Sequence, residues 1–346
     1  MARVLVIGDP HFQLDNIHNV EIAIGETVAL AETLHPSFIV ILGDILHTHG
    51  VVYTQAYKLA ILWMEQLSAV AHTYLIIGNH DYIDQTQFLT DNHIFGALNH
   101  HDRITVVDQV IRDRWGDEQF VFVPYVDVGL FRKALDTQFE NWIEDRADVT
   151  CIFAHQEFQG VKMGSIISED GDPWTVLDPI VVTGHIHETQ ILEPGIYYPG
   201  SLMQHAHGDR SSKSIWLIDF GETIRDALSY TTYQLKHIKQ RKTVKFSISD
   251  IDMFDRALCD VYHVRLVLSG TPEEKKAFIK SAEYRELSSQ CKLKIISSAI
   301  TDPLERIGRV HKSDYSFQCI LDDLMAHKSE PVQALYKKLL HDGLFS

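Results

Sequence analysis

The chain has 346 residues, of which 45% are hydrophobic and 23% are charged, a balance that excludes a mostly disordered protein. With 31 Lys and Arg against 47 Asp and Glu, the formal net charge is −16, which argues against a conventional basic nucleic-acid-binding protein. No apolar run approaches the roughly 20 residues of a membrane-spanning helix, and the run 2–7 is too short for a signal-peptide core. The four cysteines are far apart, which favours a reducing, cytoplasmic location.

Strand-like apolar runs alternate with helix-like segments up to about residue 220, which predicts an α/β fold whose sheets are covered on their faces. The predicted strands are Arg3–Ile7, Phe38–Leu42, Tyr74–Ile77, Phe120–Val123, Thr150–Phe153, Ile180–Thr183 and Ile215–Ile218. The predicted helices are Glu21–Leu34, Thr54–Val70 and Gly129–Arg146.

The composition changes near residue 230, where the basic run Lys236–Lys245 marks a predicted domain boundary. This run is interpreted equally well as a solvated linker or as a contact to a nucleic-acid backbone. Beyond it, a strand at Tyr262–Leu268, a helix at Pro272–Tyr284 and a strand at Lys292–Ser297 predict a second, compact unit. From about Tyr315 the spacing of apolar residues predicts two amphipathic helices.

Five of the predicted strands end in turns that carry carboxylate, amide or imidazole groups. These turns are GDPH (8–11), GDILH (43–47), GNHD (78–81), AH (154–155) and GHIH (184–187). Ligands of open α/β sheets gather at the carboxyl ends of the strands, so these side chains are expected to meet. Asp, His and Asn ligands without thiolate favour Mn²⁺, Fe²⁺ or Zn²⁺ over Ca²⁺. Two such ions would hold a phosphate and ionise a bridging water, as in phosphoester hydrolysis.

The five turns, in this order, resemble the signature of calcineurin-like metallophosphoesterases over roughly residues 1–220. Within that superfamily, GDILH, GNHD and the stretch from Tyr198-Pro199-Gly200-Ser201 to Gly208-Asp209 resemble the DNA double-strand-break nucleases. These include the bacterial SbcD type and the recombination endonuclease subunit of T-even-like phages. Ser/Thr phosphatases carry different second and third motifs.

The resemblance implies two divalent metal ions, Mn²⁺ first, with Mg²⁺, Fe²⁺ or Zn²⁺ as alternatives. One ion would be bound by Asp9, His11 and His187, the other by Asn79, His155 and His185, with Asp44 bridging both. The implied catalytic group is His80, which would approach the scissile phosphate without binding metal. His47 would help to position the phosphate, and Asp81 would orient the His80 imidazole.

The resemblance also implies the architecture and the partners. The expected fold is an α/β (α+β) one, an αββα sandwich of two sheets with a small α/β capping domain and a C-terminal helical tail. The expected domains are a nuclease domain at 1–228, a DNA-capping domain at 236–300 and a segment at 312–346 that binds an ABC-type, SbcC-like coiled-coil ATPase. Double- and single-stranded DNA and a second copy of the chain are the other expected partners, with no membrane. The location would be cytoplasmic, in the bacterial host if the chain is phage-encoded.

The sequence therefore predicts a Mn²⁺-dependent DNA exo- or endonuclease, one subunit of an SbcCD-like complex that processes double-strand breaks. Two alternatives stay open: a small-molecule phosphodiesterase or phosphatase of the same superfamily, and a scaffold that docks DNA and the ATPase without cutting. His205 and His207 follow the last site loop, and the sequence favours interpreting them as ordinary surface residues.

Overall fold

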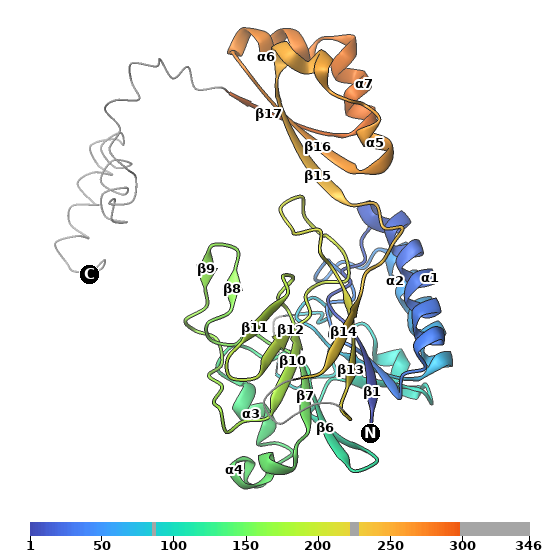
Figure 1. Cartoon of the computed structure of the whole chain (residues 1–346), viewed down its shortest axis with the longest axis vertical. Coiled ribbons are helices and arrows are strands. Elements are labelled where there is room, and N and C mark those ends of the chain that lie inside the picture. Colours follow the sequence, from blue (N-terminus) through green and yellow to red (C-terminus); the bar gives the residue numbers. More distant parts are fainter. Residues whose placement is uncertain (85–87, 222–227, 298–346) are drawn as a thin grey trace, which may run out of the picture.

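Two six-stranded sheets pack face to face in the computed structural model, which describes residues 1–84, 88–221 and 228–297 (Figure 1). In the first sheet β1 to β4 are parallel, while β13 runs antiparallel to β1 and to β14. Its order is β14 (Tyr230–Tyr233), β13 (Ile215–Asp219), β1 (Arg3–Ile7), β2 (Phe38–Ile41), β3 (His72–Ile76) and β4 (Ile104–Val107).

The second sheet has a parallel centre and an antiparallel strand at each edge. Its order is β11 (Gln190–Leu192), β12 (Ile196–Tyr198), β10 (Ile180–Gly184), β7 (Cys151–His155), β6 (Glu118–Val123) and β5 (Ile111–Trp115). A separate two-stranded hairpin, β8 (Lys162–Met163) and β9 (Ile166–Ile167), lies between β7 and β10 in the chain.

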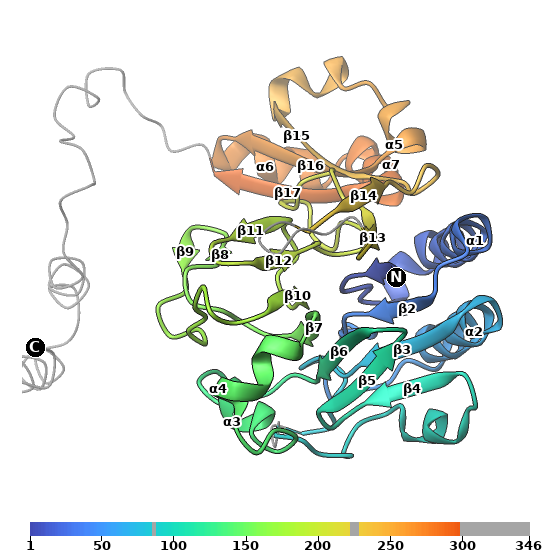
Figure 2. The same cartoon turned by 60° about the horizontal axis from the view of Figure 1, so that its bottom comes forward.

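Each strand contributes to two cores, because successive side chains of a strand point to opposite faces of the sheet. On β1, Val4 and Val6 pack between the two sheets, whereas Leu5 and Ile7 face outward. The outer face of the first sheet is covered by α1 (Ile17–Leu34) and α2 (Thr54–Val70), and that of the second by α3 (Phe131–Leu135) and α4 (Trp142–Asp145) (Figure 2). Three 3₁₀ helices complete this part: η1 (Leu14–Asn16), η2 (Gly96–His100) and η3 (Arg146–Asp148). The αββα sandwich predicted from the sequence is thus confirmed.

A third, parallel sheet has its own core. It is formed by β15 (Arg241–Ser247), β16 (His263–Gly270) and β17 (Lys292–Ser297), and is accompanied by η4 (Ile248–Met253), α5 (Leu258–Val261), α6 (Pro272–Ile279) and α7 (Ala282–Gln290). Leu266 and Leu268 point from β16 into this core, where they are fully buried with Leu287 of α7. Figure 1 shows α6 and α7 at the outer end of the molecule, with the sheet between them and the sandwich.

The opposite face of this third sheet is basic. Strand alternation places Lys245, Arg265, Lys292 and Lys294 on it, away from the core residues, and the three lysines are exposed. The other positions of these strands on the same face carry no carboxylate. We call these four residues the basic face. It stands out in a chain whose net charge is −16.

Three predicted elements differ from the structure. The single helix predicted at Gly129–Arg146 is replaced by α3, α4 and η3, with an irregular stretch between α3 and α4. The helix predicted at Pro272–Tyr284 is two helices, because the Ser281 side chain accepts a hydrogen bond from the Tyr284 amide and caps α7. The second half of the basic run Lys236–Lys245 is not a linker but the start of β15. The predicted tail helices and the segment 312–346 lie outside the described residues.

Candidate metal centre

The predicted ligands meet where the carboxyl ends of strands from both sheets come together. Asp9 and His11 follow β1, Asp44 follows β2 and Asn79 follows β3, all in the first sheet. From the second sheet come His155, the last residue of β7, and His185 and His187, which follow β10. Because β7 and β10 pair in register, His155 lies opposite Gly184, next to His185.

Asp9 and Asp44 each accept a backbone hydrogen bond at one carboxylate oxygen and leave the other oxygen without a backbone partner. The amide of His185 donates to Asp9 Oδ1 at 2.8 Å, and that of His80 donates to Asp44 Oδ1 at 2.9 Å. Asp44 Oδ2 lies 3.5 Å from both His11 Nε2 and His155 Nε2. The Asp44 carboxylate therefore stands between the two expected ligand sets, as a bridging ligand must.

The remaining ligand atoms form two close groups on either side of Asp44. His11 Nε2 lies 2.9 Å from His187 Nε2. On the other side, Asn79 Oδ1 lies 3.1 Å from His155 Nε2 and 3.0 Å from His185 Nδ1. Ligand atoms of Asp9, His11 and Asp44, and those of Asp44, His155 and His185, each lie within 4.8 Å of one another.

His155 is oriented for metal binding by a contact from its other ring nitrogen. Its Nδ1 donates to the Leu42 carbonyl at 2.6 Å, which fixes the ring orientation and directs Nε2 toward Asp44 and Asn79. Burial opposes the charged form, but the carboxylates of Asp44 and Asp9 outweigh it and raise the pKa of His155 to about 9. Asp44 is likewise buried, yet His155 and His11 hold its pKa well below the usual range.

The donor set fits divalent metal ions. Asp9 Oδ2 is buried without a hydrogen-bond partner, and burial raises the pKa of this carboxyl group. A buried acceptor without a partner is costly, so its position in a cluster with His11 and Asp44 is best explained by a cation that it would bind. Oxygen and imidazole ligands together suit Mn²⁺, Fe²⁺ or Zn²⁺.

The backbone of the ligand turns is held in a conformation that side chains usually avoid. Asp9, His11, Asp44 and His185 all have positive φ angles, of 25°, 43°, 52° and 82°. Such strain persists only where the surrounding structure enforces it, and it concentrates at functional sites. Four of the seven expected ligands therefore owe their direction to strained turns.

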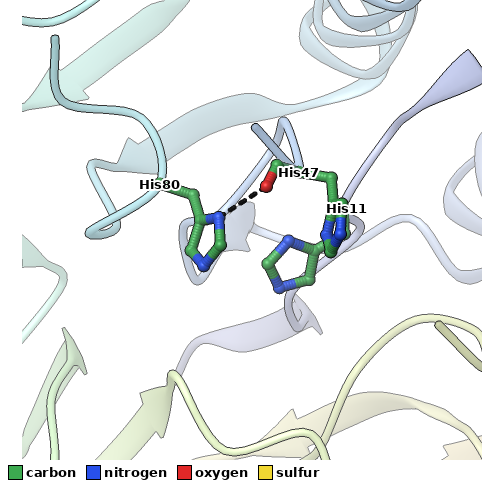
Figure 3. Close-up of side chains that lie close together, drawn as sticks. All are labelled: His11, His47 and His80. Atoms are coloured by element: carbon green, nitrogen blue, oxygen red, sulfur yellow. Dashed lines mark hydrogen bonds between the residues drawn. The ribbon is translucent and has the colours of Figure 1, made fainter. Parts of the chain in front are cut away.

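His80 and His47 lie outside the two ligand groups that contain Asp44, but with His11 they form a third cluster whose ring nitrogens lie within 4.8 Å of one another and could hold a metal ion (Figure 3). His80 Nδ1 donates to the His47 carbonyl at 2.7 Å, so His80 Nε2 is directed into the site, 4.0 Å from Asp44 Oδ2. The two rings are stacked with centroids 5.8 Å apart, and His11 meets both edge to face. Burial is the main cause that lowers the pKa of His80.

Asp81 does not contact the His80 ring in the way the sequence suggests. Its carboxylate accepts hydrogen bonds from the amides of Ile45 and Leu46 at Oδ1 and of Gly78 at Oδ2. The partner that orients His80 is instead the His47 carbonyl. Asp81 therefore ties the GDILH turn to the GNHD turn, and burial raises its pKa to about 8.

His205 lies in the site, although the sequence favours a surface position. Its ring centroid is 4.7 Å from that of His11 and 5.1 Å from that of His187, and its Nε2 donates to the Asp9 carbonyl at 2.9 Å. The sequence signal that could reveal it is the loop after Gly200-Ser201, where the Leu202 amide bonds the Gly8 carbonyl and brings the loop to the first ligand turn.

The fold and the centre define a metal-dependent phosphoesterase. The chain belongs to the calcineurin-like phosphoesterase family, whose profile matches residues 2–189. It is 35% identical over 297 residues to protein 078R of Invertebrate iridescent virus 3, covering 83% of this chain and 81% of that protein. It is 34% identical over 280 residues to protein 244L of Invertebrate iridescent virus 6, covering 81% and 98%. Both are named only as phosphoesterases, without a substrate.

Among solved structures, a similar one is the phosphoesterase YfcE from E. coli. It is 14% identical, with a TM-score of 0.30, over 66% of this chain and 98% of that one. The family fold implies bound divalent metal ions, in agreement with the clustered Asp and His side chains. Within the described residues, none of the helices has the length and apolar character to cross a membrane.

Proposed function

We propose that this phosphoesterase is a Mn²⁺-dependent DNA phosphodiesterase, the nuclease subunit of an SbcCD-like complex that processes double-strand breaks. The observation that carries the proposal is the basic face, which adjoins the loop bearing His205 beside the metal centre. A phosphodiesterase acting on a small molecule has no need of a positively charged sheet outside its catalytic domain.

The link between the basic face and the centre runs through loop 204–209. The Arg241 amide donates to Gln204 Oε1 at 2.8 Å, and His207 Nε2 donates to the His263 carbonyl at 3.0 Å. Burial and the positive charges of Arg241 and of Arg265 and Lys292 on the basic face lower the pKa of His207. A polyanion bound along this sheet would therefore lie against the loop that contacts His11 and His187.

The chemistry assigned to the residues follows from their positions. Asp9, His11 and His187 would hold one ion, and Asn79, His155 and His185 the other, with Asp44 shared. When bound, the ions would polarise the phosphodiester and lower the pKa of water. Because the His47 carbonyl accepts from His80 Nδ1, His80 would exchange a proton with the leaving oxygen, or stabilise phosphoryl charge, through Nε2. His47, beside it, would help to position the phosphate.

Two partners are proposed with this function, an ATPase subunit and a second copy of the chain. The isolated chain carries a net charge of −16, so long-range attraction to DNA is weak and a partner would supply much of the affinity. We assign this role to an ABC-type coiled-coil ATPase bound through segment 312–346, whose apolar residues follow helical spacing. A homodimer would present two metal centres to one DNA.

The test is cleavage by the purified chain of end-labelled duplex and single-stranded DNA with Mn²⁺, Mg²⁺ or EDTA. The small diester bis-p-nitrophenyl phosphate and a His80→Ala variant serve as controls. Mn²⁺-dependent DNA cutting that is lost in the variant is the expected result. Hydrolysis of the small diester with DNA left intact, even after addition of the ATPase, would instead support a small-molecule phosphodiesterase.

A further inference from the structure

Glu157 is a carboxylate beside the metal centre that belongs neither to the sequence motifs nor to the expected ligand set. It lies two positions after the expected ligand His155, where the chain leaves β7. Its Oε2 lies 3.8 Å from Nε2 of His185, and its side chain is only 14% exposed. A largely buried carboxylate that faces the ring of an expected ligand is placed to act on that ligand.

The two ring nitrogens of His185 face different neighbours. Nδ1 lies 3.0 Å from Asn79 Oδ1, among the expected ligands of the second ion, whereas Nε2 faces Glu157. A ring nitrogen that binds a cation carries no proton, so the proton of the neutral imidazole must then sit on Nε2. Nε2 is therefore a donor, and Glu157 offers it a charged acceptor of the kind that orients metal-binding histidines.

The Glu157 side chain is itself held by the base of the β8–β9 hairpin (Figure 1). Ser168 follows β9, is buried, and donates its hydroxyl to Glu157 Oε1. The same hydroxyl accepts the Gly171 amide at 3.0 Å, and the Ser168 amide donates to the Val161 carbonyl at 2.9 Å. One carboxylate oxygen is thus fixed by the hairpin, which leaves the other oxygen for His185.

The backbone on both sides of Glu157 is fixed as well. The Asp172 amide donates to the Glu157 carbonyl at 3.0 Å, and the Gln159 amide donates to the Asp172 carbonyl at 3.1 Å. The Asp172 carboxylate accepts a hydrogen bond of 2.8 Å from Gln156 Nε2. The position of Glu157 opposite His185 therefore follows from the fold of the loop rather than from a free choice of rotamer.

We propose that Glu157 is a positioning residue of the second ion site. Its carboxylate accepts a hydrogen bond from His185 Nε2 and directs Nδ1 at the ion. The contact would tighten from 3.8 Å to a hydrogen bond once Nδ1 holds an ion. The inference rests on the proposed ligand set and not on the proposed DNA substrate.

The test is calorimetric titration of the full chain, freed of metal with EDTA, with Mn²⁺. Glu157→Ala should weaken one of two Mn²⁺ equivalents at least tenfold and leave the other unchanged, since partners of metal ligands contribute about 10- to 100-fold to affinity. Glu157→Gln keeps an acceptor for His185 and should retain most of the affinity. Ser168→Ala should weaken the same equivalent as Glu157→Ala, to a smaller extent.

The matched control is Glu169→Ala, which removes an exposed carboxylate from the same loop and should leave both equivalents unchanged. Denaturant unfolding of the metal-free variants establishes that each is folded. Wild-type affinity of Glu157→Ala, or equal weakening of both equivalents, would overturn the proposal. So would a loss in Glu157→Gln as large as that in Glu157→Ala, because the effect would then come from charge and not from orientation.

Two further outcomes are distinguishable from these. If Glu157→Ala does not fold, wild-type affinity of Ser168→Ala for both equivalents overturns the proposal. If the wild type itself binds a single Mn²⁺, the two-ion ligand set fails, and the role of Glu157 fails with it.

Discussion

The carboxylates of Asp9 and Asp44 illustrate how single residues prepare the metal centre. In each, a backbone amide holds one oxygen; the second oxygen of Asp44 lies near His11 and His155, and that of Asp9 is buried without a hydrogen-bond partner. The orientation is therefore set before any ion binds, which spares the metal the entropy cost of ordering its ligands.

Replacing His80 by Ala should abolish turnover while the metal content stays near that of the wild type, because His80 lies outside the two ligand groups around Asp44. Replacing Asp44 by Asn should lose metal as well as activity, since the variant lacks the shared charge. Inductively coupled plasma mass spectrometry of both variants, alongside diester hydrolysis, checks this. Equal metal loss in the two variants would contradict the division of roles.

Replacing Asp81 by Asn should lower the free energy of unfolding by about 2 kcal/mol. The carboxylate accepts amides at both oxygens, and an amide side chain would turn its NH₂ group against either Gly78 or the pair Ile45 and Leu46. Urea unfolding of the two proteins gives the difference. If Asp81 acted mainly by orienting His80, stability would be unchanged and only turnover would fall.

Residue identity predicts which side chains gather at the centre, but it does not predict the direction of each side chain. The five turns are local in sequence, so their Asp, His and Asn residues can be recognised without knowledge of the fold. Asp81 differs because its direction depends on how two turns pack together. His205 differs because its contact to Asp9 spans 196 positions of the chain.

At the scale of elements, turn glycines allow the two sheets to approach each other. A Cβ on Gly184 would meet the Leu42 carbonyl oxygen, His155 Nδ1 at 2.9 Å and Asp9 Oδ1 at 3.0 Å. We expect Gly184→Ala to weaken metal binding at least tenfold and to cost about 2 kcal/mol of stability. Calorimetric Mn²⁺ titration and thermal unfolding measure both. Gly25→Ala, in open space on α1, is the control and should keep metal affinity unchanged.

The loop before β10 is attached to the helical layer by Asp178, which binds Arg132 and, at 2.9 Å, Arg146. Burial opposes ionisation, but the Arg132 and Thr175 hydrogen bonds prevail and hold the pKa of Asp178 below its usual range. The stabilisation is therefore present above the unfolded pKa of about 3.9 and is lost as pH falls through the folded value.

Replacing Asp178 by Asn should consequently destabilise the protein by about 2 kcal/mol at pH 7. The difference from the wild type should shrink progressively below about pH 4. Denaturant unfolding at a series of pH values measures this convergence. A difference that stays constant down to pH 2 would argue against the charge as its cause.

The sequence predicts the bounds of helices and strands that contain a clear apolar pattern, and it misses elements that lack one. The helix predicted at Thr54–Val70 matches α2 in both bounds. The strand β5 has only Ile111 and Trp115 as large apolar residues and lacks the continuous run that marks its neighbours. The failure at Gly129–Arg146 has a tertiary cause, because Asp172 accepts the amides of Gly129 and Phe131 and fixes where the chain turns into α3.

For the whole molecule, the proposed nuclease function and the basic face together predict how duplex DNA binding would depend on salt. Lys245→Ala/Lys292→Ala/Lys294→Ala should reduce the slope of log affinity against log salt by about 2.7, at about 0.9 per phosphate contact. Hydrolysis of bis-p-nitrophenyl phosphate reports separately on the metal centre. A control variant, Lys276→Ala/Lys280→Ala, removes two exposed lysines from α6 and its C-terminus, away from the basic face, and should retain the wild-type slope. An unchanged slope in the triple variant would place the DNA elsewhere.

The origin of the ligands in both sheets has a consequence for the protein as it is synthesised. Asp9 emerges first and His187 follows 178 positions later, after nearly the whole sandwich has been made. A nascent or truncated chain that lacks β10 has only part of the ligand set, so it cannot assemble both ion sites. The capacity to hydrolyse phosphoesters thus arises only after both sheets have been made, and a proteolytic fragment that contains only one of the two sheets would lack it.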